Sequence, residues 1–282
     1  MMELRVSVET HTCVSSLNDN VRTVRMMRRI SWLNSNVCTV RTTRRKYASL
    51  HRAGNGLCLL LLLLLATTCI AQPAGPMAIV EVTSKTPVSA DKLLKLCQKY
   101  HVPATGVYRW QNHLVAYGKA GDIQSVNRNL AALYPGATVK LYAAPFYHFD
   151  RQRCDNKATA KQWKNIILTC QLVPNEAKQR EYLNYHATQF EQWPEVANGF
   201  CNASFQQLLV FRQGRQLMLV ISIPKGADLD ELNPRTTQNN PRVDDWNQLM
   251  KQYQTGLSGT KPNEVWVFMQ PVSAVKQAVP RE

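Results

Sequence analysis

The strongest constraint on the fold is an order of strand-like and helix-like segments that occurs twice along the sequence. Residues 77–83 alternate with the two-residue period of a strand, other short segments are rich in β-forming residues, and the helix-like segments place apolar side chains at helical spacing. In the first copy, strands are predicted over residues 77–83, 105–110, 113–117 and 137–143, and helices over residues 89–100 and 122–134. The order of this copy is therefore βαββαβ.

The second copy lies in the C-terminal half and has the same order. Its strands are predicted over residues 165–173, 205–211, 216–223 and 264–270, and its helices over residues 174–190 and 244–253. This order is typical of the ferredoxin-like fold, in which a four-stranded antiparallel sheet carries two helices on one face. The sequence thus predicts an α+β protein with two ferredoxin-like βαββαβ units, over residues 77–148 and 162–273, and a polar linker over residues 146–161.

The strand predicted over residues 217–223 indicates how the two units are arranged. Its odd-numbered residues are all Leu or Ile, and its even-numbered residues are Met218, Val220 and Ser222. A sheet covered by helices on one side only would have a polar opposite face, so both faces of this strand are predicted to be buried. We expect the two sheets to pack together within one chain as a dimeric-type α/β barrel, with a ligand pocket between them. The alternative is a homodimer formed by the C-terminal half.

The first 71 residues are predicted to be a leader rather than part of the fold. Residues 57–70 are almost entirely apolar, with seven consecutive leucines, and they follow basic residues and precede small ones. This run is shorter than the roughly 20 residues of a membrane-spanning helix, but it is typical of a signal-peptide core. We expect cleavage after Ala71, no integral membrane segment in the mature chain, and export to the periplasm or the outer membrane. A buried core helix and a lipoprotein acylated at Cys69 are the alternatives.

Upstream of this core, residues 16–29 recur with changes as residues 32–45. Two copies are too few for a solenoid, which needs at least about three repeats. Our hypothesis is a misassigned start, in which a repeated non-coding stretch is read as protein. The alternative is a disordered basic arm.

Charge and cysteine spacing argue against two classes of function. The chain has a net charge of +15, but residues 1–56 hold ten Lys and Arg against three acids, so the basic excess is concentrated in the leader. The rest has no basic stripe interleaved with aromatic residues, so nucleic acid is not expected as a partner. The four cysteines after the leader are Cys97, Cys154, Cys170 and Cys201, and none are in C-x-x-C spacing. A zinc site or a thioredoxin-type redox site therefore has no support. The four cysteines allow three disulfide pairings, and free buried thiols are equally compatible with the sequence.

The residues that could carry chemistry begin in the first helix of the second copy. Tyr182 and His186 are four positions apart, so they are neighbours on one face of a helix. From composition alone, such a pair is more often a core pair than a catalytic one. Further candidates are Trp193, Trp246, Arg242 and Asp245, and the long polar segment over residues 224–241 is a candidate lid. No cluster has metal-ligand spacing, so neither a metal nor a cofactor is expected.

Residues from about 165 to 271 resemble the L-rhamnose mutarotase family. The resemblance rests on Tyr182 and His186 early in the first helix, on Trp193-Pro194-Glu195, on the hairpin of apolar strands that follows, and on Trp246 in the second helix. It implies a dimeric α/β barrel of ferredoxin-like units that interconverts the α and β anomers of L-rhamnose without a metal or cofactor. It covers the C-terminal half of the chain and leaves the N-terminal half without a counterpart.

The function that the resemblance implies is a sugar mutarotase acting on L-rhamnose or a related deoxysugar. Opening the sugar ring requires one proton to leave the anomeric hydroxyl and one to reach the ring oxygen, and a His near its ordinary pKa serves both directions. The expected catalytic residues are His186 and Tyr182, and the expected sugar-binding residues are Trp193, Trp246, Arg242 and Asp245. The alternative is a non-catalytic module that binds a saccharide or a protein. An open cavity beside Tyr182 and His186 would favour the enzyme, and a tightly packed His186 would favour the module.

Overall fold

The computed structural model describes residues 75–272 of the chain. The predicted signal core, the repeat upstream of it and Cys69 lie outside the described residues. Within residues 75–272, no helix combines the length and the apolar character that crossing a membrane requires.

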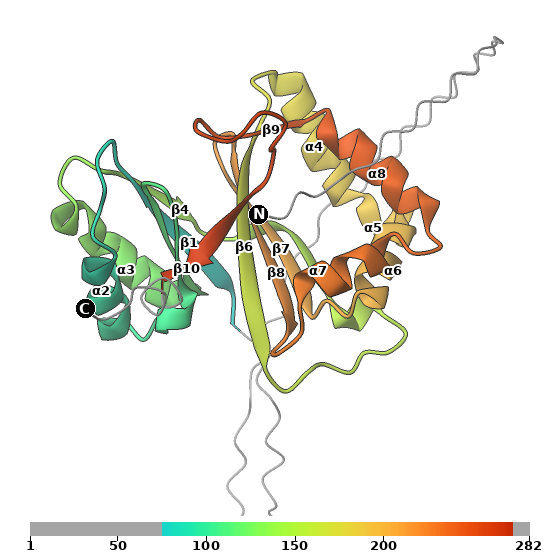
Figure 1. Ribbon diagram of the computed structural model, residues 1–282, viewed down its shortest axis with the longest axis horizontal. Coiled ribbons are helices and arrows are strands. Elements are labelled where there is room, and N and C mark those ends of the chain that lie inside the picture. The colour runs from blue at the N-terminus through green and yellow to red at the C-terminus, as the bar shows by residue number, and fades with distance from the viewer. Residues whose placement is uncertain (1–74, 273–282) are drawn as a thin grey trace, which may run out of the picture. The chain divides into compact units, whose positions relative to one another are not determined.

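The N-terminal part of the described chain forms the first βαββαβ unit (Figure 1). Its strands are β1 (Met77–Thr83), β2 (Val107–Trp110), β3 (His113–Lys119) and β4 (Thr138–Tyr142), in the spatial order β4-β1-β3-β2. A short 3₁₀ turn, η1 (Ala104–Gly106), precedes β2, and the two helices are α2 (Ala90–Lys99) and α3 (Ala120–Leu133). Alternate residues of β1, including Val80 and Val82, pack against Leu93 of α2 and Ile123 of α3. All the strands and helices predicted for this unit are present.

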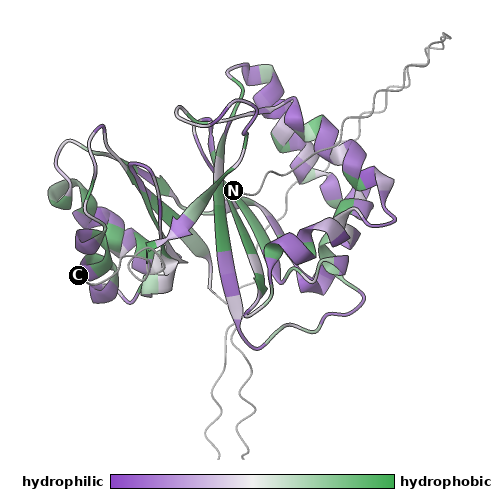
Figure 2. Cartoon of the chain, viewed as in Figure 1, coloured by the Kyte–Doolittle hydropathy of each residue, from purple (hydrophilic) through white to green (hydrophobic). Residues whose placement is uncertain are grey.

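The C-terminal unit repeats this arrangement. Its strands are β6 (Trp163–Leu172), β7 (Gln207–Gln213), β8 (Gln216–Pro224) and β10 (Val267–Pro271), in the order β10-β6-β8-β7, and a two-residue strand, β9 (Gln254–Thr255), also pairs with β6. The helices α4 (Glu176–Ala187) and α8 (Pro241–Lys251) correspond to the two predicted helices. Apolar residues dominate the strands, whereas the helices are largely polar (Figure 2), as expected for helices that cover one face of a sheet.

The prediction of the first helix of this unit, over residues 174–190, was wrong in its extent. The helix ends at Ala187 and is followed by α5 (Gln189–Gln192) and by α6 (Pro194–Asn202), which the sequence analysis did not predict. A proline disfavours the helical conformation of the residue before it, and Trp193 accordingly has φ −136° and ψ 51°. Pro194 then begins α6, because a proline is accommodated at the first position of a helix.

Two segments predicted to be irregular contain regular structure. The predicted linker begins with β5 (Pro145–Asp150) and η2 (Arg151–Arg153), and β5 pairs antiparallel with β7. Tyr147 and Phe149 of β5 are buried in the core of the C-terminal unit, as the alternation of a half-buried strand requires. The polar segment over residues 224–241 contains α7 (Leu229–Leu232) and η3 (Asn233–Thr236).

The two sheets join into one sheet that closes almost completely on itself. Strand β10 pairs with β6 of its own unit and with β2 of the first, so the sheets are continuous across it. The remaining ends of the sheet are β4 and β5, which are connected in the chain by only Ala143 and Ala144. The short connection forces the two end strands together, and β4 lies against β7. The result is the predicted dimeric-type α/β barrel within a single chain.

Side chains fill the space between the two sheets. Met218 and Val220 of β8 face this inter-sheet core, which also contains Ile79 and Tyr117 of the first unit, whereas Leu217 on the opposite face packs beneath the helices. The prediction that both faces of this strand are buried is therefore confirmed. The ligand pocket expected between the sheets is not found. The described side chains occupy that layer with apolar contacts and a polar network.

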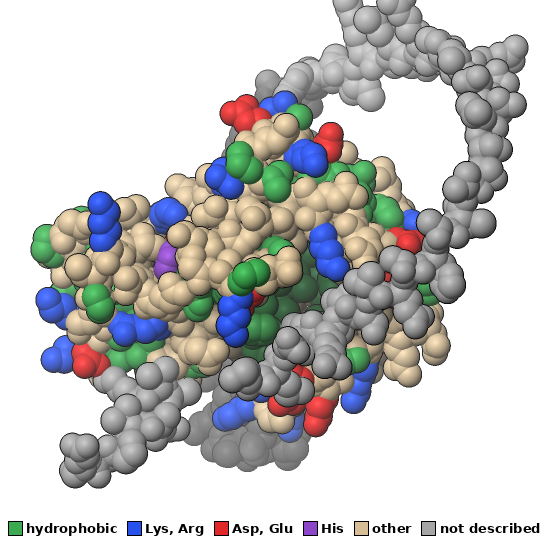
Figure 3. All heavy atoms as spheres, turned by 45° about the horizontal axis from the view of Figure 1, so that its top comes forward, with side chains coloured by type: hydrophobic (Ala, Val, Ile, Leu, Met, Phe, Trp, Pro, Cys, Tyr) green, Lys and Arg blue, Asp and Glu red, His purple; other side chains and the backbone are tan. Residues whose placement is uncertain are grey.

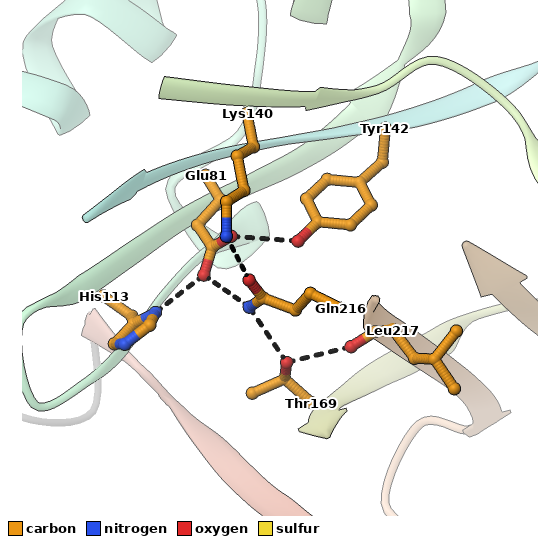
Figure 4. Close-up of polar contacts among 7 residues, drawn as sticks. All are labelled: Glu81, His113, Lys140, Tyr142, Thr169, Gln216 and Leu217. Atoms are coloured by element: carbon orange, nitrogen blue, oxygen red, sulfur yellow. Dashed lines mark hydrogen bonds and ion pairs between the residues drawn. The ribbon is translucent and has the colours of Figure 1, made fainter. Parts of the chain in front are cut away.

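Glu81 is the centre of this polar network (Figure 4). Its side chain is fully buried, and its Oε1 lies 2.7 Å from His113 Nδ1 and accepts a hydrogen bond of 2.9 Å from Gln216 Nε2. Its Oε2 accepts a hydrogen bond of 2.9 Å from the Tyr142 hydroxyl, and Lys140 Nζ donates to Gln216 Oε1 at 2.5 Å. The network thus binds β1, β3 and β4 of the first unit to β8 of the second.

Basic side chains do not gather into one patch on the face of the molecule that Figure 3 shows. Lys and Arg residues are spread over this face, with Asp and Glu residues between them. Such a mixed distribution differs from the basic stripe that tracks a nucleic-acid backbone.

One disulfide is present among the described cysteines. Cys154, which follows η2, is bonded to Cys201 in α6 across a sequence separation of 47 residues, and Cys97 and Cys170 are free and buried. The bond attaches α6 to the segment that connects β5 and β6. It selects one of the pairings that the sequence left open.

We expect loss of this disulfide to lower the free energy of unfolding by about 4 kcal/mol, the loop-closure entropy of a loop of this length. The measurement is urea unfolding of wild type and of a variant with both Cys154→Ser and Cys201→Ser. Reductant should lower the wild type to the level of the variant and leave the variant unchanged. Equal stability of the two proteins without reductant would contradict the prediction.

A second prediction concerns the buried carboxylate. Burial raises the pKa of Glu81, but the hydrogen bond and charge of His113, the charge of Lys140 and the hydrogen bond from Gln216 outweigh it, so the pKa is lower than 4.5. A carboxylate with a lowered folded pKa stabilises the protein above its unfolded pKa, and this stabilisation disappears as the pH falls through the folded value. We expect the free energy of unfolding to drop between about pH 5 and pH 3, and to drop less in Glu81→Gln. The exposed Glu231→Gln is the matched control, and an identical acid dependence in all three proteins would refute the role given to Glu81.

Candidate functional site

Helix α4 positions the two residues predicted to be catalytic. The side chain of Asn175 caps its N-terminus by accepting a hydrogen bond of 3.0 Å from the backbone N–H of Lys178. The buried residues of the helix are Gln179, Tyr182 and His186, which recur at three- and four-residue spacing and face the sheet. Tyr182 and His186 therefore lie in the layer between the C-terminal sheet and its helices, and not between the two sheets.

His186 is surrounded by aromatic rings. Its ring centroid lies 4.3 Å from that of Tyr182, 5.6 Å from Phe146, and 5.3 Å from both Tyr147 and Trp246. We refer to these five residues together with Trp193, which lies 5.6 Å from Trp246, as the aromatic cluster. The side chain of His186 is only 9% exposed, so the cluster shields it from water.

A local hydrogen bond determines the form of His186. Its Nδ1 lies 2.9 Å from the backbone carbonyl oxygen of Tyr182, and because a carbonyl only accepts, Nδ1 carries the proton. Nε2 is then the nitrogen with a free lone pair. Burial lowers the pKa of His186 to about 4, against the smaller opposing effect of the Tyr182 carbonyl. His186 is therefore a neutral imidazole at physiological pH, and the expectation that its pKa lies near the ordinary value was wrong because burial lowers it.

The hydroxyl of Tyr182 is also fixed by a neighbour. Gln254 of β9 donates a hydrogen bond of 3.3 Å from Nε2 to this hydroxyl, and Trp266 Nε1 donates one of 3.0 Å to Gln254 Oε1. Because Trp266 occupies the carbonyl oxygen of the amide, Gln254 presents its N–H to Tyr182 and leaves the hydroxyl proton available for donation. Burial, followed by the nearby Cys170 thiol, raises the pKa of Tyr182. The phenol therefore stays protonated.

The predicted sugar-binding residues occupy the outer side of the cluster. Trp246 is buried and contacts His186, whereas Trp193 is half-buried and has the guanidinium carbon of Arg242 at 3.9 Å from its ring centroid. Arg242 lies 4.0 Å from a carboxylate oxygen of Glu195 and 3.9 Å from one of Asp245. The side chain of Asp245 is 65% exposed and contacts Arg242, not the aromatic cluster.

Two cavities in the described part of the chain do not include His186. One of about 590 Å³ is lined by residues that include Glu195 and Asn198, and another of about 750 Å³ is lined by residues of the first unit that include Lys95 and His101. Neither is lined by Tyr182 or His186. The close packing of His186 favours a binding module over an enzyme. Among residues 75–272, no three His, Cys, Asp or Glu side chains are grouped to hold a metal ion.

Four residues of this site were missed from the sequence. Phe146 and Tyr147 contribute rings from β5, which was predicted to be linker, although the alternation of residues 145–150 carried a strand signal. Gln254 lies in a strand too short to show any periodicity, and Trp266 was expected only in the core. No sequence pattern identifies these last two as partners of Tyr182.

The C-terminal unit matches a known protein family. The family model described as L-rhamnose mutarotase matches residues 165–274. An L-fucose mutarotase from Xanthomonas campestris pv. campestris is 30% identical over 100 residues, which are 35% of this chain and 78% of that protein. A UPF0734 protein from Dictyostelium discoideum is 23% identical over 113 residues, which are 40% of this chain and 88% of that protein.

Among solved structures, a candidate monooxygenase from Fusobacterium nucleatum aligns with 70% of this chain and 92% of its own, with 11% identity and a TM-score of 0.37. The residues matched by the family model begin in the C-terminal unit at β6 and include the helix that carries Tyr182 and His186. Through this unit, the chain belongs to the L-rhamnose mutarotase family.

Proposed function

We propose that this protein is a mutarotase that interconverts the α and β anomers of L-rhamnose, L-fucose or a related deoxysugar. The observation that carries the proposal is the form of His186, whose Nδ1 is bound to the Tyr182 carbonyl and whose Nε2 is left as a neutral base. Family membership through residues 165–274 supports this chemistry. The similarity to an L-fucose mutarotase is the reason for including L-fucose.

In the proposed reaction, His186 takes one proton from the sugar and returns it at a different oxygen. Nε2 of His186 accepts the proton of the anomeric hydroxyl as the bond between the anomeric carbon and the ring oxygen breaks, which gives the open-chain aldehyde. The imidazolium returns the proton to the ring oxygen, now a hydroxyl, and closure on the other face of the carbonyl reverses these steps. Tyr182 keeps its own proton because of its raised pKa, and it stabilises the charge on the ring oxygen by donating a hydrogen bond.

Substrate access requires a movement within the aromatic cluster. His186 is nearly buried, so a sugar reaches Nε2 only when a ring that covers it, such as that of Phe146 or Trp246, rotates aside. Trp246 and Trp193 then offer faces for the C–H groups of the sugar. Arg242, whose side chain is 44% exposed, is placed to bind a hydroxyl once it leaves the Trp193 ring.

The second candidate function is a non-catalytic module that binds a saccharide. The specific observation in its favour is the close packing of His186, which leaves little room for a substrate at Nε2. Measurement of anomer exchange by saturation-transfer NMR separates the two functions, since an enzyme accelerates exchange of free sugar and a binding module does not.

We further propose that the protein acts outside the cytoplasm as a self-contained barrel. The disulfide between Cys154 and Cys201 supports an oxidising compartment, in agreement with the expected signal peptide. The first unit covers the sheet face that a second copy would cover in a dimeric barrel. A homodimer is therefore not needed to complete the barrel.

The central prediction concerns Nε2 of His186. In His186→Asn the amide nitrogen can still donate to the Tyr182 carbonyl, but the base is absent. We expect anomer exchange of L-rhamnose or L-fucose to slow by about a hundredfold, the usual contribution of a positioned acid–base group. Unchanged exchange in a folded His186→Asn protein would eliminate this mechanism.

The same variant provides a readout of protonation that does not depend on activity. The folded pKa of about 4 is lower than the ordinary 6.5, so the unfolded chain binds more protons between these pH values. Acidification from pH 6.5 to 4 should therefore remove up to about 3 kcal/mol of wild-type stability, and His186→Asn should lack this component. Parallel unfolding free energies of the two proteins across this range would show that His186 is not a buried neutral imidazole.

A further prediction tests the orientation of the Tyr182 hydroxyl. Gln254→Glu keeps the shape of the side chain but replaces the donor with an acceptor, so the Tyr182 proton is drawn away from the sugar. We expect exchange to slow by about tenfold, because the activation free energy rises by about the worth of one neutral hydrogen bond. Gln254→Met, which removes the contact without capturing the proton, is the matched control and should slow exchange less. An equal effect of the two variants would reduce Gln254 to a packing residue.

A further inference from the structure

The cavity beside α6 is lined entirely by polar residues. It has a volume of about 590 Å³, within the range of small-molecule sites. Glu195, Asn198 and Asn202 form one wall, and since they are three and four positions apart they lie on one face of α6. The opposite wall is formed by Arg235 of η3 and by residues 238–240, which lie in the connection between η3 and α8.

The lining has the chemistry of a hydroxyl-binding surface. Five of its seven residues, Asn198, Asn202, Gln238, Asn239 and Asn240, carry carboxamides, each of which both donates and accepts hydrogen bonds, as a sugar hydroxyl does. The other two, Arg235 and Glu195, have opposite charges, so the lining carries no formal net charge. This composition suits a neutral polyol better than an anion or a metal cation.

Glu195 supplies an acceptor that nothing in the described chain satisfies. Its Oε2 is buried and has no hydrogen-bond partner among residues 75–272, and its Oε1 lies 4.0 Å from Arg242 Nε. A buried acceptor without a donor is unfavourable, and because the Glu195 side chain is 39% exposed, a rotation that turns Oε2 toward the cavity would let it accept a hydrogen bond from a ligand hydroxyl.

The walls of the cavity are held in place before any ligand arrives. Gly199 brings α6 against η3 so closely that a Cβ at this position would lie 2.5 Å from the carbonyl oxygen of Thr236. Asn240 Nδ2 donates a hydrogen bond of 2.8 Å to the carbonyl oxygen of Glu195, which connects the two walls directly. A site fixed in this way avoids the cost of ordering its residues on binding.

We propose that this cavity is a second saccharide site, which binds a neutral monosaccharide through its hydroxyl groups. It is distinct from the site of the proposed reaction, because neither Tyr182 nor His186 lines it. Trp246 contacts His186, and the ring centroid of Trp193 lies 5.6 Å from that of Trp246, but neither tryptophan lines the cavity. The inference stands independently of the mutarotase activity.

The test is NMR titration of the wild-type protein with L-rhamnose and with L-fucose, observing the side-chain amide resonances of Asn198 and Asn202. We expect saturable shifts there and at the side-chain amide of Asn239, and we expect the double variant Asn198→Ala and Asn202→Ala to weaken binding at least tenfold, measured at Asn239, while anomer exchange stays unchanged. Both residues are exposed on α6, so alanine should not disturb the fold. Asn184→Ala, on the exposed face of α4, is the matched control and should bind as wild type does.

The outcomes separate this inference from the proposed function. His186→Asn should retain the shifts at Asn198 and Asn202 although it loses exchange. Shifts at these amides in a wild-type protein that shows no exchange would support the second site and refute the mutarotase. Absence of shifts at about 100 mM of either sugar, a concentration well above the millimolar range of weak specific binding, would overturn the second site whatever the exchange rate is.

Discussion

Burial of both faces of β8 is the constraint on which the rest of the structure depends. One face of this strand packs under the helices of its own unit, and the other contacts the sheet of the first unit. In the second contact, Gln216 donates a hydrogen bond to the carboxylate of Glu81. This carboxylate is a buried charge in a layer that is mostly apolar. Such a charge is tolerated only where donors surround it, so the network specifies how the two sheets align as well as contributing to their stability.

This arrangement also bears on where the proposed reaction takes place. Because side chains fill the inter-sheet layer, the residues to which we assign the reaction lie in the layer between the C-terminal sheet and its helices. Strand β5 and helix α4 bring Phe146, Tyr147 and His186 together in that layer, and Trp246 closes it from α8. The same helices present their polar edges outward, and there the cavity beside α6 is found.

The strands and main helices were predictable from the sequence because each has a regular period and a single buried face or pair of faces. The twofold βαββαβ order and the apolar side chains on both faces of residues 217–223 predicted the barrel, with a homodimer as the alternative. The turn at Trp193 that begins α6 was predictable from Pro194 but was not predicted. The pairing of Cys154 with Cys201 and the contact of Gln254 with Tyr182 were not predictable, because each joins residues that are distant in the sequence and leaves no periodic pattern.

The two-residue connection between β4 and β5 has a consequence for assembly. In a barrel built from two separate chains, the halves dissociate on dilution, and the fraction assembled depends on protein concentration. Here the connection keeps the two halves at a high effective concentration relative to each other. The barrel therefore stays assembled at any dilution, and its two halves are free to diverge, so that Tyr182 and His186 occur in one of them only.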